Sequence, residues 1–173
     1  MLGTVEIATD LVVMALIRNP DGDVWLGEKW KGNGRRVNAG GHFEPGRDAS
    51  FRHTAVREVK EETHVSIRLQ SLTHVASVRF IHLADDETVR WIVTSYIYGV
   101  TTRRLLRDSD EIGNFRRYRP EALPLDRMYP SDIDWMVRAM DGGDVVEKCY
   151  THRKGLLINT QPFDVPVEHR SLI

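Results

Sequence analysis

The chain has 173 residues, of which 41% are hydrophobic and 28% are charged, as is ordinary for a soluble globular protein. Its formal net charge of -1 gives no broad cationic field, which argues against a nucleic-acid polymer as ligand. The single cysteine, Cys149, excludes an intramolecular disulfide and a cysteine-based zinc site, and is compatible with a reducing cytoplasm. The longest apolar run, residues 11–17, is too short to span a membrane and follows no basic segment, so we expect neither a membrane span nor a signal peptide.

The first part of the chain predicts two strands, a loop and a helix. Branched residues at 11–17 are typical of a buried strand, and residues 24–29 predict a second strand that forms a hairpin with it across the turn sequence NPDGD. Glycine is frequent in residues 29–48, which predicts a loop. Residues 51–63 predict a helix with Ser50 as its N-cap.

The rest of the chain predicts more strands and a second long helix. In chain order we expect paired strands at 73–83 and 88–100, a strand at 113–119, a helical turn at PEALP, a helix at 131–140 capped by Ser131, and a terminal hairpin within 145–160 that turns at Lys154 and Gly155. These elements favour a mixed sheet with helices packed on it. We expect one domain over residues 1–173.

Three glutamates crowd the second half of the predicted helix at 51–63. At about 100° per residue, Glu62 falls inside the apolar stripe of this helix, and Glu58 and Glu61 flank it. Like charges three or four residues apart repel each other, and acidic groups are unfavourable near a helix C-terminus. The apolar stripe itself consists of Phe51, Ala55 and Val59.

A solvated acidic face is the ordinary explanation of such a charge run, but a carboxylate beside the core needs a partner. Oxygen ligands from one helical face are what Mg²⁺ or Mn²⁺ prefers, and these ions also bind phosphates. The glutamates therefore indicate a divalent-metal site, and Arg57 is expected to pair with a neighbouring carboxylate or backbone group. The seven histidines show no metal-binding spacing and are interpreted as structural or surface residues.

The sequence GGHFEPG at 40–46, followed by AVREVKEETHV at 55–65, resembles the Nudix box of MutT-type hydrolases. That box runs glycine, five residues, glutamate, seven residues, Arg-Glu, an aliphatic residue, any residue, Glu-Glu, any residue, glycine and an aliphatic residue. The half from Arg57 to Val65 matches closely. The resemblance implies an α/β fold, the Nudix fold, with an α/β/α sandwich around a mixed sheet.

The sequence departs from the box at two places. The spacing from Gly41 to Arg57 is longer by two residues, so the first box glutamate has no direct counterpart, and Asp48 is its expected substitute. His64 stands where the box has its second glycine. Histidine is among the residues tolerated in a left-handed helix stop, so we expect the helix to end there.

The resemblance also implies a reaction: water attacks a phosphorus of a nucleoside diphosphate linked to another group. It assigns the catalytic site to Arg57, Glu58, Glu61 and Glu62, with Arg57 orienting a glutamate and Glu58 as the plausible base. It places the bound Mg²⁺ or Mn²⁺ on Gly40 (through its carbonyl), Glu58, Glu61, Glu62 and Glu111. Metals at this place neutralise phosphate charge and lower the pKa of bound water.

Outside the box, the chain is similar to MutT homologues that hydrolyse oxidised purine nucleoside triphosphates. The segment MYPSDIDW at 128–135 resembles the one whose aromatic residue stacks on the base and whose acid bonds to it, which implies Tyr129 and Asp132. Asn38 is a further candidate contact to the base. We therefore expect a small nucleotide as the partner, and the sequence indicates no partner protein.

Three functions remain open at this point. The first is a metal-dependent pyrophosphohydrolase that cleaves a nucleoside triphosphate, such as an oxidised purine nucleotide, to the monophosphate and pyrophosphate. The second is a Nudix hydrolase of a nucleotide sugar or a dinucleotide. The third is a non-catalytic Nudix-fold domain that binds a nucleotide, although such domains usually lose glutamates of the box and this chain keeps all three.

Overall fold

The computed structural model describes residues 9–31 and 33–173. The first residues of the predicted domain, 1–8, and Gly32 of the predicted loop lie outside the described residues. None of the helices in the described ranges has the length and apolar character that a bilayer crossing demands.

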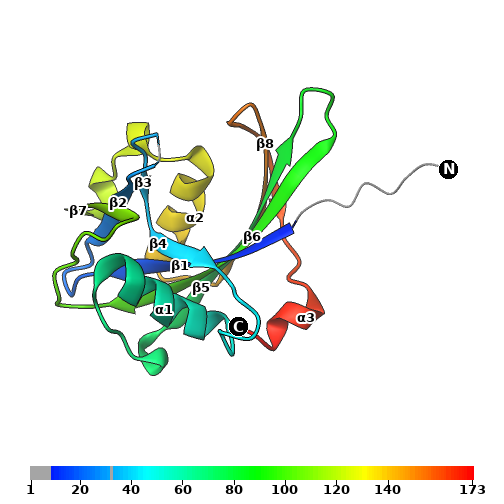
Figure 1. Cartoon of the computed structure of the whole chain (residues 1–173). Helices are drawn as coiled ribbons and strands as arrows, with labels where there is room; N and C mark the ends of the chain where they lie inside the picture. Colours follow the sequence, from blue (N-terminus) through cyan, green and yellow to red (C-terminus); the bar gives the residue numbers. More distant parts are fainter. Residues whose placement is uncertain (1–8, 32) are drawn as a thin grey trace.

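The strands of the described chain form one mixed sheet (Figure 1). Its order is β3-β2-β1-β6-β5-β8-β9, with β4 also paired to β1 and β7 to β2. The β1–β6 and β5–β8 pairs are parallel, and the remaining pairs are antiparallel. The strands are β1 (Thr9–Arg18), β2 (Val24–Lys29), β3 (Arg36–Val37), β4 (Ala39–His42), β5 (Thr73–Leu83), β6 (Val89–Thr101), β7 (Ile112–Tyr118), β8 (Val146–Arg153) and β9 (Leu156–Pro162).

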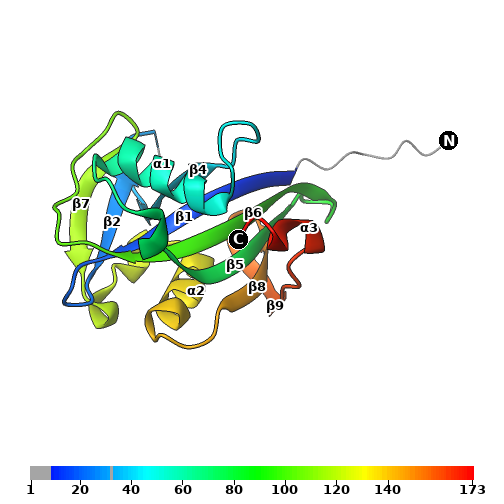
Figure 2. The ribbon, with the colours of Figure 1, turned by 90° about the horizontal axis from the view of Figure 1, so that it is seen from below.

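Two long helices cover opposite faces of the sheet, α1 (Phe51–Thr63) and α2 (Pro130–Met140), as Figure 2 shows. Each lies over its own apolar core, because side chains of a strand alternate between the two faces. Val13 and Ala15 of β1 pack in the core under α1, whereas Leu16 packs in the core under α2. The expected α/β/α arrangement is therefore confirmed. A short helix, α3 (Val167–Arg170), follows β9.

Most of the predicted elements are present close to their predicted bounds. The helix at 51–63, the paired strands β5 and β6, and the terminal hairpin of β8 and β9 are confirmed. In that hairpin, Lys154 and Gly155 both have positive φ, of 52° and 76°. Two such residues form the tight turn whose twist suits antiparallel strands.

Two expectations about local structure were wrong. The interval 29–48 is not all loop, because it contains β3 and β4, which are too short to show an alternating pattern. Tyr129, not Ser131, occupies the N-cap position of α2, since Pro130 is already helical and has no amide that needs a cap. Ser50 does occupy the N-cap position of α1, as expected, although its hydroxyl contacts Nδ1 of His53 (3.0 Å) and makes no capping hydrogen bond.

Candidate active site

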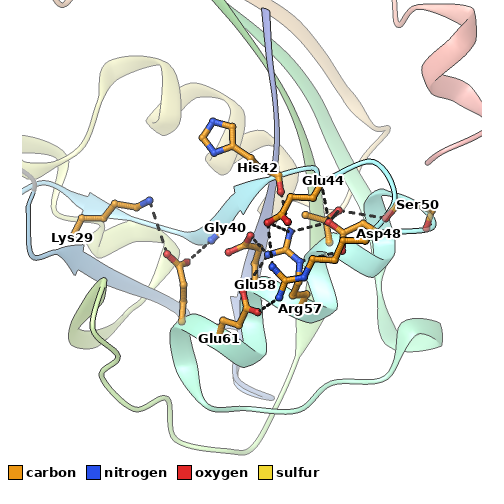
Figure 3. Close-up of polar contacts among 12 residues, drawn as sticks. Lys29, Gly40, His42, Glu44, Asp48, Ser50, Arg57, Glu58 and Glu61 are labelled. Atoms are coloured by element: carbon orange, nitrogen blue, oxygen red, sulfur yellow. Dashed lines mark hydrogen bonds and ion pairs between the residues drawn. The ribbon is translucent and has the colours of Figure 1, made fainter.

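Arg57 lies at the centre of a network of carboxylates on α1 and on the loop before it (Figure 3). Its Nη1 donates hydrogen bonds to Glu58 and, at 3.1 Å, to Glu61. Its Nη2 donates to the backbone carbonyl of His42 at 2.9 Å. Arg57 thus joins β4 to the acidic face of α1, as expected for a residue that orients glutamates.

The lengthened loop before α1 brings Asp48 to Arg57. Nε of Arg57 donates to Oδ1 of Asp48 at 3.0 Å, and Nη2 donates to Oδ2 at 2.8 Å. Asp48 also accepts bonds from the Thr54 hydroxyl and the Glu44 amide. The two-pronged contact with Arg57 holds the pKa of Asp48 below its usual range. Asp48, the expected substitute for the first glutamate of the box, therefore lies beside Arg57.

Replacing Asp48 by asparagine is expected to lower the free energy of unfolding at pH 7 by about 2 to 3 kcal/mol, the usual contribution of charge-assisted hydrogen bonds. Because the folded-state pKa is depressed, this contribution is present above the unfolded-state value of 3.8 and is lost as the pH falls through the folded-state pKa. Urea unfolding at several pH values tests this. A stability difference that stays constant down to pH 2 would contradict it.

Glu58 projects from α1 against the backbone of β4. A β-carbon built on Gly41 would lie 2.4 Å from Oε1 of Glu58, so only glycine leaves room for this carboxylate. The Glu58 side chain is 12% exposed. Burial raises the pKa of Glu58 against the opposing effect of Arg57, and the charges of Glu61 and Glu111 raise it further.

Glu62 is buried more deeply, with 3% of its side chain exposed. Its Oε2 accepts a hydrogen bond of 2.6 Å from the amide of Gly40, and Oε1 lies 3.9 Å from Nζ of Lys29. Burial raises the pKa of Glu62 to about 7, with smaller contributions from the charges of Glu58 and Glu111. The sequence predicted this position correctly, because Glu62 falls inside the apolar stripe of α1.

In the arrangement described, the acidic side chains face protein partners. Glu61 is bound by Arg57 and, at 2.6 Å, by Nη2 of Arg47. Among residues 9–31 and 33–173, no group of three His, Cys, Asp or Glu side chains is placed to hold a metal ion. The three predicted glutamate ligands of α1 thus lie on one face of the helix, but the predicted ligands are not gathered around one point, and the ligand set stays a prediction.

The chemistry of this donor set nevertheless suits a divalent cation. Glu58 and Glu62 are two buried carboxylates whose pKa values are raised by burial and by the charges of neighbouring glutamates. Lys29, the cation beside Glu62, is 3.9 Å away and about half exposed, so the charge is poorly compensated. A hard divalent ion would supply that compensation through the carboxylate oxygens that Mg²⁺ and Mn²⁺ prefer.

His64 links the end of α1 to the loop that carries Glu111. It adopts a left-handed conformation with φ of 59° and ends the helix, as expected from its place in the box. Its Nε2 contacts the carbonyl of Asp108 at 3.1 Å, and the amide of Arg107 donates to the carbonyl of Thr63. The charge of the exposed Glu111 adds to the raised pKa values of Glu58 and Glu62, and its role as a further metal ligand stays a prediction.

A cavity of about 330 Å³ lies on the α2 side of the sheet. Tyr129 and Asp132, the two predicted base contacts, both line it, at the start of α2. Met14 of β1 forms part of its floor. The structure therefore brings Tyr129 and Asp132 together at one cavity. Strand β1, which contributes Met14 to this cavity, also pairs with β4 beside the acidic network.

Asp132 and Tyr129 are each held in place by a neighbour. Oδ1 of Asp132 accepts a hydrogen bond from Nε1 of Trp135 at 3.1 Å, and burial raises the pKa of Asp132 to about 6. The guanidinium of Arg35 lies 4.4 Å from the centre of the Tyr129 ring, and it donates to the carbonyl of Met128. Such a cation over an aromatic face restrains the ring.

Asn38 is not among the residues that line this cavity. It lies between β3 and β4 and is 5% exposed. Within the described parts of the chain, its Oδ1 finds no hydrogen-bond donor. A buried amide oxygen without a donor is costly, so a ligand or water at this place would be favourable.

Three residues beside the acidic network or the cavity were not predicted from the sequence. Lys29 ends β2 beside Glu62, and charge alone did not distinguish it from other surface lysines. His82 and His152 line the cavity, although the histidines were interpreted as structural or surface residues. A usable signal was the alternation along the strands, since Phe80 and His82 occupy every second position and so share one face.

Comparisons with known proteins agree with this architecture. By structure, the chain is similar to a MutT protein from Bacillus halodurans (TM-score 0.71, 18% identity, 88% of this chain and 96% of that chain covered). It is also similar to a MutT protein from Methanosarcina mazei Go1 (TM-score 0.65, 21% identity, 80% and 98%). A third similar structure is an Ap4A hydrolase from C. elegans (TM-score 0.57, 18% identity, 77% and 96%).

Among curated protein sequences, none matches the chain. The NUDIX domain, however, matches residues 8–139, which includes the whole acidic network and the start of α2. That match covers more than half of the chain, and the fold and the box agree with it. The chain therefore belongs to the Nudix family and carries a Nudix hydrolase domain.

Proposed function

We propose that the protein is a divalent-metal-dependent pyrophosphohydrolase that cleaves a nucleoside triphosphate to the monophosphate and pyrophosphate, with oxidised purine nucleotides as the preferred substrates. The observation that carries this proposal is the connection between the acidic network and the cavity. Met14 lines the cavity and pairs with Gly40, whose amide contacts Glu62. The cavity and the network lie on opposite faces of the sheet, so in this proposal the nucleotide passes the edge of β4, whose only strand partner in the described chain is β1.

The metal, Mg²⁺ or Mn²⁺, supplies two effects when bound: it neutralises phosphate charge and lowers the pKa of bound water. The chain's own residues prepare its place. Arg57 holds Glu58 and Glu61 on the same side of α1, and the Gly40 amide fixes Glu62. The proposed ligands are the Gly40 carbonyl, Glu58, Glu61, Glu62 and Glu111.

Glu58 is the proposed base that accepts a proton from the attacking water. Its contact with Arg57 and its place against Gly41 fix the carboxylate near the other glutamates. Lys29 adds a positive charge at the side of the site where phosphate oxygens would lie. In this proposal, proton acceptance and charge stabilisation take place in one small region.

The proposed base contacts explain the preference for an oxidised purine. Tyr129 offers a ring held by Arg35 on which a base can stack. Asp132 offers a carboxylate oxygen to N–H groups of the base. An 8-oxopurine carries an N–H at position 7, where an ordinary purine carries an acceptor nitrogen, so it offers this carboxylate a further donor.

The test is product analysis with a panel of substrates, each with Mg²⁺ or Mn²⁺. The panel holds ordinary and oxidised nucleoside triphosphates, nucleotide sugars and dinucleotides, and chromatography separates pyrophosphate from phosphate. Pyrophosphate and the monophosphate from an oxidised purine triphosphate are the expected products. Faster cleavage of a sugar or dinucleotide would overturn the substrate, and nucleotide binding without turnover would indicate a binding domain.

The variant Asp132→Asn tests the base contact separately. It keeps the shape of the side chain but offers one oxygen instead of two, and it replaces an acceptor by an N–H donor. We expect the preference for the oxidised over the ordinary purine triphosphate to fall roughly tenfold to hundredfold, as for the loss of one good contact to a base edge. An unchanged ratio of kcat/KM values would remove Asp132 from the base site.

A further inference from the structure

The far wall of the cavity is built by strands β5 and β8 and carries two stacked histidines. His82 and His152 are direct partners in the parallel β5–β8 pair, and their ring centres lie 5.2 Å apart with an angle of 18° between the planes. On its other side, His82 stacks on Trp91 at 4.3 Å. Stacking on both of its sides restrains His82, which lines the cavity together with His152.

His152 is polar and buried, and its Nδ1 has no hydrogen-bond partner in the described part of the chain. The residue is 5% exposed. Burial lowers the pKa of His152, and the neighbouring His82 lowers it further, so the ring is neutral near pH 7. A neutral imidazole has one N–H donor and one acceptor nitrogen, and leaving such groups unpaired in the interior is costly.

The position of His152 in the chain is a second, independent observation. The NUDIX domain match ends at residue 139, whereas His152 lies on β8, after that end. Gly155, in the turn of the same hairpin, also lines the cavity. The β8 part of this wall therefore lies outside the segment that the NUDIX domain matches, whereas the β5 part lies inside it.

We propose that His152 is a specificity-determining residue that forms a hydrogen bond through its imidazole with the purine base of the nucleotide. The inference rests on the proposed function, because it takes the cavity as the base site. Asp132 and His152 both line that cavity. In this inference the Asp132 carboxylate is the acceptor and the N–H of the neutral imidazole is the donor. Together they match a base edge on which an N–H and a carbonyl are neighbours, as in an oxopurine.

Direct binding tests this without requiring turnover. Binding of 8-oxo-dGMP, dGMP and ribose 5-phosphate to the full chain is measured by calorimetry for wild type and for His152→Phe, which keeps an aromatic ring beside His82. We expect His152→Phe to weaken binding of the nucleotide about tenfold and to leave the weak binding of ribose 5-phosphate unchanged. The variant His152→Asn, which restores a donor and an acceptor, is expected to recover part of the loss.

Stability separates recognition from a structural role. His152→Phe removes an unpaired buried nitrogen, so its melting temperature is expected to equal or exceed that of wild type. The matched control is His53→Phe, on the exposed side of α1. It should change neither the affinity for the nucleotide nor the melting temperature. Equal affinities of wild type and His152→Phe, or failure of wild type to bind either nucleotide, would overturn the inference. Binding without hydrolysis would support it and would overturn only the proposed reaction.

Discussion

Replacement of Glu62 by glutamine is expected to reduce kcat by about 10³-fold while the protein stays folded. The loss corresponds to several kcal/mol of metal-dependent stabilisation of the transition state, at 1.36 kcal/mol for each factor of ten. The fold is expected to survive because the amide of Gly40 can still donate to the glutamine oxygen. The substitution also removes a buried charge with 3% side-chain exposure.

Three measurements check this expectation: kcat, the urea-unfolding curve and the affinity for Mn²⁺. Glu121→Gln is the matched control, since Glu121 is exposed in the short helical turn before α2. Loss of kcat and of Mn²⁺ affinity with an unchanged unfolding curve supports Glu62 as a metal ligand. If the variant keeps wild-type kcat, the assignment of the metal site to this face of α1 is wrong.

Replacement of Arg57 by glutamine is expected to have the largest effect on stability, a loss of about 3 to 5 kcal/mol in the free energy of unfolding. The reason is the environment of Asp48, whose side chain is 3% exposed and would keep its charge without its cation. Glu58 and Glu61 would lose their common partner as well. Turnover should therefore fall even under conditions where the variant is folded.

Arg138→Gln is the control for a generic loss of an ion pair. Arg138 pairs with Asp134 one helical turn away, with side-chain exposures of 56% and 33%, and such pairs contribute less than about 1 kcal/mol. The double variant Arg57→Gln, Asp48→Asn should lose less than the sum of the two single variants, because both remove the same contact. Additive losses would show that Arg57 and Asp48 stabilise the protein independently.

The residues of α1 show how far sequence reasoning reaches. The helical period alone placed Glu62 in the apolar stripe, and Glu62 is indeed buried beside β4. The left-handed stop at His64 followed from its place in the box. These predictions succeed because they depend on contacts and geometry within one element, which the local sequence determines.

Contacts between segments that are far apart in the chain could not be predicted from local sequence patterns. The contact between Asp48 and Arg57 depends on how a lengthened loop folds, whereas only the length of that loop can be read from the sequence. The pairing of His82 with His152 joins strands far apart in the chain. Strand β4 has only four residues, two of them glycines, so it carries no alternating pattern and is defined by its pairing with β1.

The parallel pairing of β8 with β5 has a consequence for where the protein can be cut. Residues Ala76–Leu83 of β5 pair with Val146–Arg153 of β8, beyond the end of the NUDIX match at residue 139. A fragment that stops at this boundary would leave one side of β5 as an open edge, which favours strand addition between molecules and aggregation. The segment that the NUDIX domain matches, residues 8–139, is therefore shorter than the segment needed to cover the edge of β5.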